Sequence, residues 1–303
     1  MSTIAASIER RPLIAFFVLA YALTWPLIPL VSVSPLLGFP ALFGPAIAAV
    51  IVAAITDGRP DLRDLLGRLV RWRVGVRWYA VALGLPMVLA LTAAGLHLLL
   101  GARATVDFGG LSALNFVVFV LIVGEELGWR GYALPRLLAQ RSALAASLIL
   151  GVMWGAWHLP TFFVTGAPQY GLPFSAFVLL TMAYSVVIGW VYVHARGSVL
   201  IASLMHGAIN LSQGFFLGGV YPAQEYWLLA AVYGVAALGV TLAFGANLSR
   251  KRYVEANRPG CKTRHRAVDS RCGRATGSYS ASVPPGILLL EVAHHVLSAK
   301  PVA

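Results

Sequence analysis

Apolar residues in this sequence come in long blocks separated by short polar, Gly-rich or Pro-rich breaks. The blocks have the length of about 17–25 residues that crosses the hydrocarbon core of a bilayer as an α-helix. They predict eight transmembrane helices, at residues 13–33, 36–56, 78–100, 111–130, 145–165, 174–195, 198–218 and 226–246. The pattern therefore predicts an all-α, polytopic membrane protein whose helical domain occupies residues 1–246.

The composition supports the same class. Hydrophobic side chains make up 59% of the 303 residues and charged ones only 11%, with a mean hydropathy of +0.78. Soluble domains carry about 25% charged residues. A large soluble enzyme is therefore excluded.

Arginines are distributed unequally between the two sides of the predicted membrane. If the amino terminus is cytoplasmic, twelve arginines of the helical domain lie inside and only Arg103 lies outside. Short loops rich in Lys and Arg remain cytoplasmic. We therefore expect both termini on the cytoplasmic side of the plasma (inner) membrane. The net charge of +12 suits an anionic lipid surface and does not require a nucleic-acid partner.

Two segments outside the spans have distinctive patterns. Residues 61–79 place Leu62, Leu65, Leu66, Leu69 and Val70 near one helical face and arginines on the others, which predicts an amphipathic helix lying on the membrane or a solvated loop helix. Residues 247–303 hold ten of the 23 Lys and Arg residues, both cysteines and few apolar residues. We expect this second segment to be a basic, disordered cytoplasmic tail.

Glu125 and Glu126 lie inside the predicted fourth span, where a charge costs about 2.5–3.5 kcal/mol. Arg130 follows Glu126 by four residues, so the two share a helical face and can form an ion pair. Glu125 points elsewhere and remains available as a base. The alternative is that both glutamates only mark the cytoplasmic end of the helix.

Two later spans carry polar side chains at helical spacing. The fifth has Trp154 one turn before His158, and the seventh has His206 one turn before Asn210. His97 and His194 lack such a partner and fit interhelical hydrogen bonding. Each histidine alone fits that role better than catalysis.

Glu125, His158, His206 and Asn210 together supply what hydrolysis of a carbonyl needs: a group that accepts a proton from water, one that orients it, and donors for the oxyanion. Depth arithmetic at about 1.5 Å per residue puts Glu125 roughly 10 Å and His206 about 12 Å from the cytoplasmic face. The same arithmetic puts His158 at about 20 Å, so it meets the others only if its helix is tilted, kinked or starts later.

The segments GEELGWRGY, WGAWH and HGAIN resemble the three motifs of the CAAX-protease and bacteriocin-processing intramembrane proteases, which are Glu-Glu-x-x-x-Arg, Phe-x-x-x-His and His-x-x-x-Asn. Their order and their placement on separate helices also match. Trp154 stands where the family usually has Phe, a change expected only to reshape the pocket wall.

The resemblance implies a role for each matching residue. Glu125 would activate water and His158 would orient or help to deprotonate it, while His206 and Asn210 would stabilise the oxyanion. Glu126 and Arg130 would support the site. Because the family is commonly classed as metalloproteases, His158, His206 and Glu125 could hold a divalent metal such as zinc; a metal-free attack by water is the equal alternative.

The resemblance also implies a membrane-associated or lipidated peptide or protein as substrate, as in the cleavage after a prenylated cysteine by eukaryotic members. Two alternatives stay open. One is an inactive scaffold, immunity or sequestering protein of the same fold. The other is a small transporter, since intramembrane Glu and His also occur in proton relays, although the chain shows no paired broken helices.

Overall fold

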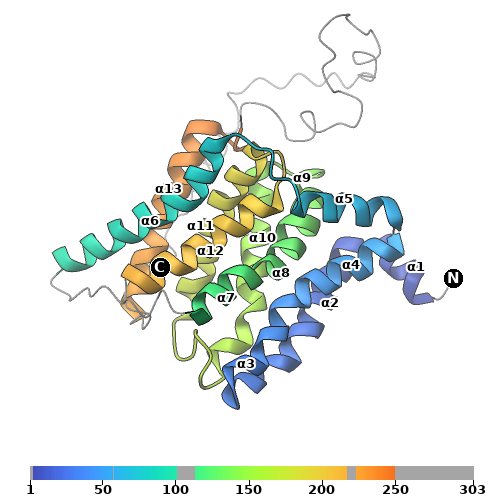
Figure 1. Ribbon diagram of the computed structural model, residues 1–303, viewed down its shortest axis with the longest axis horizontal. Helices are drawn as coiled ribbons and strands as arrows, with labels where there is room; N and C mark the ends of the chain where they lie inside the picture. Colours follow the sequence, from blue (N-terminus) through green and yellow to red (C-terminus); the bar gives the residue numbers. More distant parts are fainter. Residues whose placement is uncertain (1–2, 57, 101–112, 217–222, 250–303) are drawn as a thin grey trace, which may run out of the picture. The chain divides into compact units, whose positions relative to one another are not determined.

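The computed structural model describes residues 3–56, 58–100, 113–216 and 223–249 (Figure 1). Within these ranges the chain is helical and contains no strand. Most of the predicted tail, including Cys261 and Cys272, lies outside the described residues. The elements, in chain order, are α1 (Thr3–Arg10), α2 (Pro12–Thr24), η1 (Trp25–Ser32), α3 (Pro35–Gly38), η2 (Phe39–Phe43), α4 (Gly44–Thr56), α5 (Arg59–Leu69), α6 (Val76–Leu99), α7 (Ala113–Leu121), α8 (Val123–Glu126), η4 (Leu127–Ala133), α9 (Leu134–Leu138), α10 (Ala143–Trp157), η5 (Leu159–Phe162), α11 (Phe174–His194), α12 (Val199–Phe216) and α13 (Ala223–Phe244).

The predicted all-α membrane fold is confirmed. Five helical stretches of the described chain are long and apolar enough to cross a membrane, namely Pro12–Ser32, Leu36–Thr56, Val76–Leu99, Phe174–His194 and Tyr226–Phe244. They match five of the eight predicted spans. The other three correspond to a helix in several pieces from Ala113 to Leu138, the shorter apolar helix Ala143–Trp157, and α12, and for these the crossing stays a prediction.

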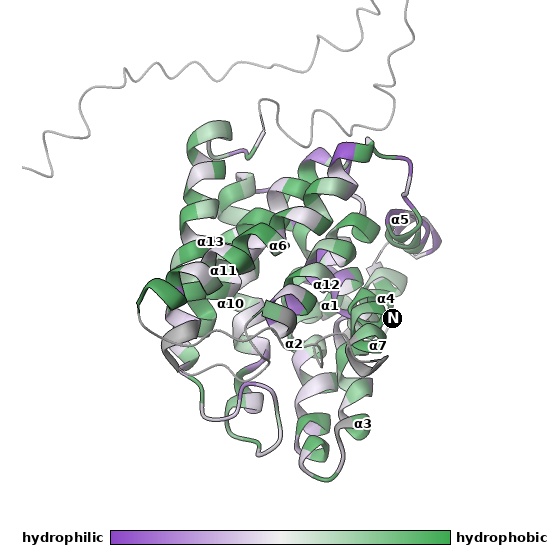
Figure 2. Ribbon diagram, turned by 60° about the vertical axis from the view of Figure 1, so that its left-hand side comes forward, coloured by the Kyte–Doolittle hydropathy of each residue, from purple (hydrophilic) through white to green (hydrophobic). Residues whose placement is uncertain are grey.

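The distribution of polarity is that of a protein surrounded by lipid. Large apolar side chains face outward, among them Val18 (61% exposed) and Leu242 (77% exposed), while Glu126 and Arg130 are fully buried. Figure 2 shows apolar residues over most of the helices and a hydrophilic α5. A charge buried among apolar helices is costly, and the buried Glu126 and Arg130 are paired with each other.

Glycines permit the close helix contacts that hold the site. On α10, Gly151 and Gly155 lie one turn apart and face α11, where a β-carbon on Gly151 would come within 2.5 Å of the Met182 Cα. Small residues at this spacing allow membrane helices to approach closely. The contact fixes α10, and with it Trp154 and His158, against α11.

The amphipathic segment forms a helix, α5, that is shorter than predicted. Leu65 is 2% exposed, and Leu62 and Leu69 pack against the core, whereas Leu66 and Val70 are exposed. The apolar residues of α5 are thus divided between contacts with the bundle and the outer surface, and the position of the helix on a membrane stays a prediction. Two sets of contacts hold α5 against the long helix that carries Arg130. One is packing between α5 and η4, and the other is the ion pair of Asp61 on α5 with Arg136 on α9.

Candidate active site

A buried ionic cluster joins the first and third sequence motifs. Glu126 Oε1 accepts hydrogen bonds from Arg130 Nη1 at 2.7 Å and from His206 Nδ1 at 2.8 Å. Glu126 and Arg130 are fully buried and His206 is 4% exposed. The predicted pairing of Glu126 with Arg130 is confirmed. Arg130 also donates to Ser185 Oγ of α11 at 3.3 Å, a partner that helical spacing within one segment could not reveal.

The pair is built on a wide helical turn. Residues Leu127–Ala133 form a π-helix, η4, between α8 and α9. Such turns are rare and occur frequently at functional sites. Arg130 lies in the middle of this turn, with its guanidinium carbon 4.8 Å from the centroid of the Trp154 ring. The sequence pattern predicted an ordinary helix here.

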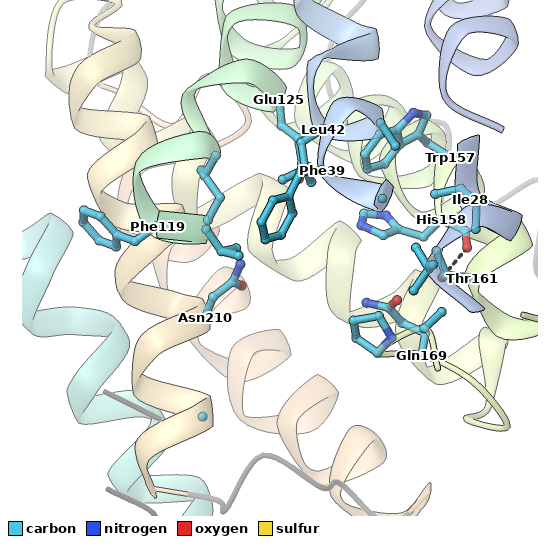
Figure 3. A pocket seen from close by; sticks show the side chains of 18 of the residues that line it. Ile28, Phe39, Leu42, Phe119, Glu125, Trp157, His158, Thr161, Gln169 and Asn210 are labelled. Carbon is cyan, nitrogen blue, oxygen red and sulfur yellow. Dashed lines mark hydrogen bonds between the residues drawn. The ribbon is translucent and has the colours of Figure 1, made fainter. Parts of the chain in front are cut away.

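Glu125 points away from this cluster toward a cavity of about 530 Å³. His158 at the end of α10 and Asn210 of α12 line the same cavity, as Figure 3 shows. Three separate elements thus bring a carboxylate, an imidazole and a carboxamide to one space. Much of the remaining wall is apolar, with further polar groups from residues that the sequence analysis did not identify: Thr161, Gln169 and Gln213.

His206 and Asn210 are one turn apart on α12 but have different surroundings. His206 is buried against Glu126, whereas Asn210 is exposed at the cavity. Because a carboxylate oxygen can only accept, the hydrogen bond to Glu126 requires a proton on His206 Nδ1. The Nε2 atom of His206 can therefore donate only when the ring is doubly protonated.

Trp154 lies between the motifs. Its indole Nε1 donates to Glu125 Oε2 at 3.0 Å, and its backbone carbonyl accepts from His158 Nδ1 at 2.9 Å. The ring centroids of Trp154 and His206 are 4.9 Å apart in an edge-to-face arrangement. The expectation that Trp154 only shapes the pocket wall is therefore too narrow.

The helix that carries Glu125 extends further than predicted. It continues past Arg130 through η4 and α9 to Leu138, so Glu125 lies 13 residues, or about 20 Å, from its end. Glu125 and His158 line the same cavity, so the separation expected from the sequence arithmetic does not keep them apart. On α12 the preceding turn is itself buried, with Ala195 and Ser198 inaccessible, so the helix of His206 begins below the surface of the bundle.

His194 of α11 lies away from the residues of the candidate site and makes packing contacts. His194 Nδ1 bonds to the Trp190 carbonyl at 3.0 Å, and its ring packs against Trp78 and Phe244. The hydrogen bond lies within α11, and the contacts with α6 and α13 are ring packing, so these contacts do not include the interhelical hydrogen bond that was expected.

Nδ1 of His158 and Nδ1 of His206 both take part in hydrogen bonds within the protein, so Nε2 of each ring is the atom that could bind a metal. Across the described ranges, no group of three or more His, Cys, Asp and Glu side chains is arranged to hold an ion. The dependence of the reaction on a metal stays a question for experiment.

The fold and the site define a polytopic helical membrane protein with an ionisable cluster and a cavity inside its bundle. Residues 107–212 match the family described as type II CAAX prenyl endopeptidase Rce1-like. The chain is 29% identical over 200 residues to CAAX prenyl protease 2 of Methanococcus maripaludis, covering 59% of this chain and 71% of that relative. These matches agree with the resemblance carried by the three motifs, and the matched segment contains all the candidate site residues.

A second relative belongs to another functional class. The chain is 25% identical over 228 residues to the uric acid permease PucK of Bacillus subtilis, covering 69% of this chain. It spans about half, 51%, of the permease.

Proposed function

We propose that this protein is an intramembrane endopeptidase that hydrolyses peptide bonds with water activated by Glu125 and His158. One observation carries the proposal: Glu125, which forms no part of the Glu126–Arg130 ion pair, faces a cavity also lined by His158 and Asn210. Placing an ionisable group inside a membrane protein costs free energy, so such a residue is usually retained because it has a function. The match to prenyl endopeptidases supports the same reaction class.

The first step is attack by water on the scissile carbonyl carbon. His158 Nδ1–H donates a hydrogen bond to the Trp154 carbonyl, so Nε2 holds a lone pair that can accept a hydrogen bond from the water. Glu125 takes one water proton as the C–O bond forms, and the carbonyl oxygen becomes an oxyanion.

The second step is collapse of the tetrahedral intermediate. The Asn210 amide N–H groups stabilise the oxyanion, and the proton held by Glu125 passes to the leaving nitrogen as the C–N bond breaks. The products are a carboxylic acid and an amine. Glu125 is ionised again as soon as it has given its proton to the nitrogen, and the product acid then loses its own proton to the amine or to water.

The buried cluster keeps the charges around Glu125 balanced. With Glu125, Glu126 and Arg130 all ionised, one further positive charge on His206 makes the set neutral. If Glu125 is protonated instead, a neutral His206 has the same effect. Once water attack has placed a proton on Glu125 and a negative charge on the oxyanion, an imidazolium His206 keeps the set neutral and supplies a second donor.

We further propose the setting of the reaction. The substrate is a membrane-associated or lipidated peptide, approached from the cytoplasmic leaflet of the plasma (inner) membrane, and both termini are cytoplasmic. Residues 1–246 form the catalytic domain and residues 247–303 a separate basic tail. The scaffold and transporter alternatives remain as outcomes of the tests. The mostly apolar cavity beside a carboxylate that has no ion-pair partner of its own favours hydrolysis over both.

The test compares wild type with Glu125→Gln in detergent, with matched melting curves. Both are incubated with peptides that carry a farnesylated cysteine three residues before the carboxyl terminus, and with the same peptides unprenylated. Cleavage by wild type alone supports the proposal. Equal cleavage by both proteins contradicts the role of Glu125, and no cleavage by either counts against this substrate class. A chelator arm tests for dependence on a metal.

A further inference from the structure

One side chain touches residues of all three sequence motifs. Trp154 hydrogen bonds to Glu125, lies beside the Arg130 guanidinium, shares its carbonyl with His158 and packs edge-on against His206. It is 3% exposed. A phenyl ring in its place could keep the aromatic contacts, because those depend on the ring face and edge. It could not replace the indole N–H.

The indole N–H is directed at the carboxylate that the proposed reaction uses. The distance from Trp154 Nε1 to Glu125 Oε2 is 3.0 Å, within the normal range for a hydrogen bond. Bonds from a neutral donor to a carboxylate are among the stronger ones, and they restrict rotation of the carboxyl group. Glu125 sits at the edge of a cavity, so its side chain needs such a constraint to keep one orientation.

Several other buried tryptophans have no hydrogen bond of this kind. The indole N–H groups of Trp129, Trp157 and Trp190 are buried with no hydrogen-bond partner in the part of the chain that the structure describes. The bundle thus buries indole groups for packing alone at several positions. At Trp154 the donor has an acceptor, and that acceptor is the candidate base.

We propose that Trp154 is a positioning residue whose indole N–H holds Glu125 in the orientation required to activate water. This inference rests on the proposed function and adds to it a donor that phenylalanine at the same position lacks. The bond leaves Glu125 Oε1 available to receive the water proton. Its loss lets the carboxylate rotate, which lowers the fraction of the protein that is ready to react.

The first experiment does not depend on activity. The protein is labelled with ¹⁵N-tryptophan in detergent micelles, and the Trp154 indole resonance is assigned by its loss in Trp154→Phe. A hydrogen-bonded indole proton should lie downfield and move toward the free-indole position in Glu125→Ala. A resonance already at the free position in wild type, or one unmoved in Glu125→Ala, overturns the proposal.

The second experiment measures peptide cleavage. In Trp154→Phe, kcat should fall by about 10- to 100-fold while KM changes little, as expected for loss of a hydrogen bond to a charged group. Replacing Trp154 with benzothienylalanine, which keeps the shape of indole but has sulfur instead of N–H, should give the same loss. An unchanged kcat in either variant overturns the proposal.

Trp190→Phe is the matched control. It also removes a buried indole N–H, but that group has no partner and packs against Trp78 and Phe244 away from the cavity. Its kcat should stay within about twofold of wild type. An equal fall in kcat in Trp190→Phe would show a general packing effect and overturn the assignment. If wild type cleaves none of the peptides, the proposed function fails for them, and the indole resonance still decides the hydrogen bond.

Discussion

Gly128 of η4 lies directly against Pro45 of α4, so closely that a β-carbon on Gly128 would be 2.6 Å from the Pro45 carbonyl carbon and oxygen. Real β-carbons do not approach backbone atoms to that distance. Both atoms belong to the main chain, so they cannot turn aside as a flexible side chain could. The contact fixes the π-helix against α4 two residues before Arg130.

Gly128→Ala should therefore destabilise the protein by about 1–3 kcal/mol, the usual cost of overpacking. The measurement is thermal unfolding in detergent. Gly84→Ala on α6 is the control, because nothing lies within 4 Å of a β-carbon there, and its melting temperature should be unchanged or slightly raised. Equal stability of the two variants would mean that η4 and α4 are not in tight contact.

The ion pair of Glu126 and Arg130 gives a second prediction. Both side chains are 0% exposed, so Arg130→Met leaves a buried carboxylate with His206 as its remaining partner. Removing one partner of a buried pair costs about 3–5 kcal/mol. Thermal melting should show a large drop for Arg130→Met.

The double variant Glu126→Gln/Arg130→Met serves as the control for that prediction. It removes both charges, so it should be more stable than Arg130→Met alone. If the double variant is no more stable than the single one, the loss comes from packing of the Arg130 side chain and not from an unpaired charge.

The ion pair of Asp61 and Arg136 should hold α5 on the bundle. The two side chains are 14% and 24% exposed, so the pair is partly screened and worth about 1 kcal/mol. Asp61→Asn should speed amide hydrogen exchange in Arg59–Leu69 by roughly fivefold. Asp64→Asn is the control, since Asp64 is 51% exposed in its pair with Arg68 and should have a smaller effect. Equal effects would argue against the tether.

The Glu126–Arg130 pair could be predicted from sequence because both residues lie on one helical segment. Residues four apart share a helical face, and an isolated charged side chain in an apolar segment requires a partner of opposite charge close by. The end of the same helix was predicted wrongly. Arg130 looks like a residue at the membrane surface, yet it is buried because Glu126, Ser185 and the ring of Trp154 surround it. Ser185 comes from another helix, and helical periodicity carries no information about such a partner.

The contact between Trp154 and Glu125 shows the same limit within the site. The two residues are 29 positions apart, and their hydrogen bond depends on how α8 and α10 pack. From sequence, Trp154 could be recognised only as an aromatic residue in a known motif. The polar cavity residues Gln169 and Gln213 were missed for a similar reason, because neither has a charged neighbour or a motif that distinguishes it.

The arginine distribution predicts the topology, which single-cysteine labelling can measure. With Cys261 and Cys272 changed to Ser, Leu100→Cys at the C-terminal end of α6, where Leu100 is 78% exposed, should react with a membrane-impermeant maleimide added to intact cells. Ala139→Cys, at an exposed position just after α9, should react only after the cells are opened, because the Arg-rich loops remain in the cytoplasm. The cysteine-free protein controls for background labelling. Labelling in the opposite order would place Arg136 and Arg141 outside and contradict a site that opens to the cytoplasmic leaflet.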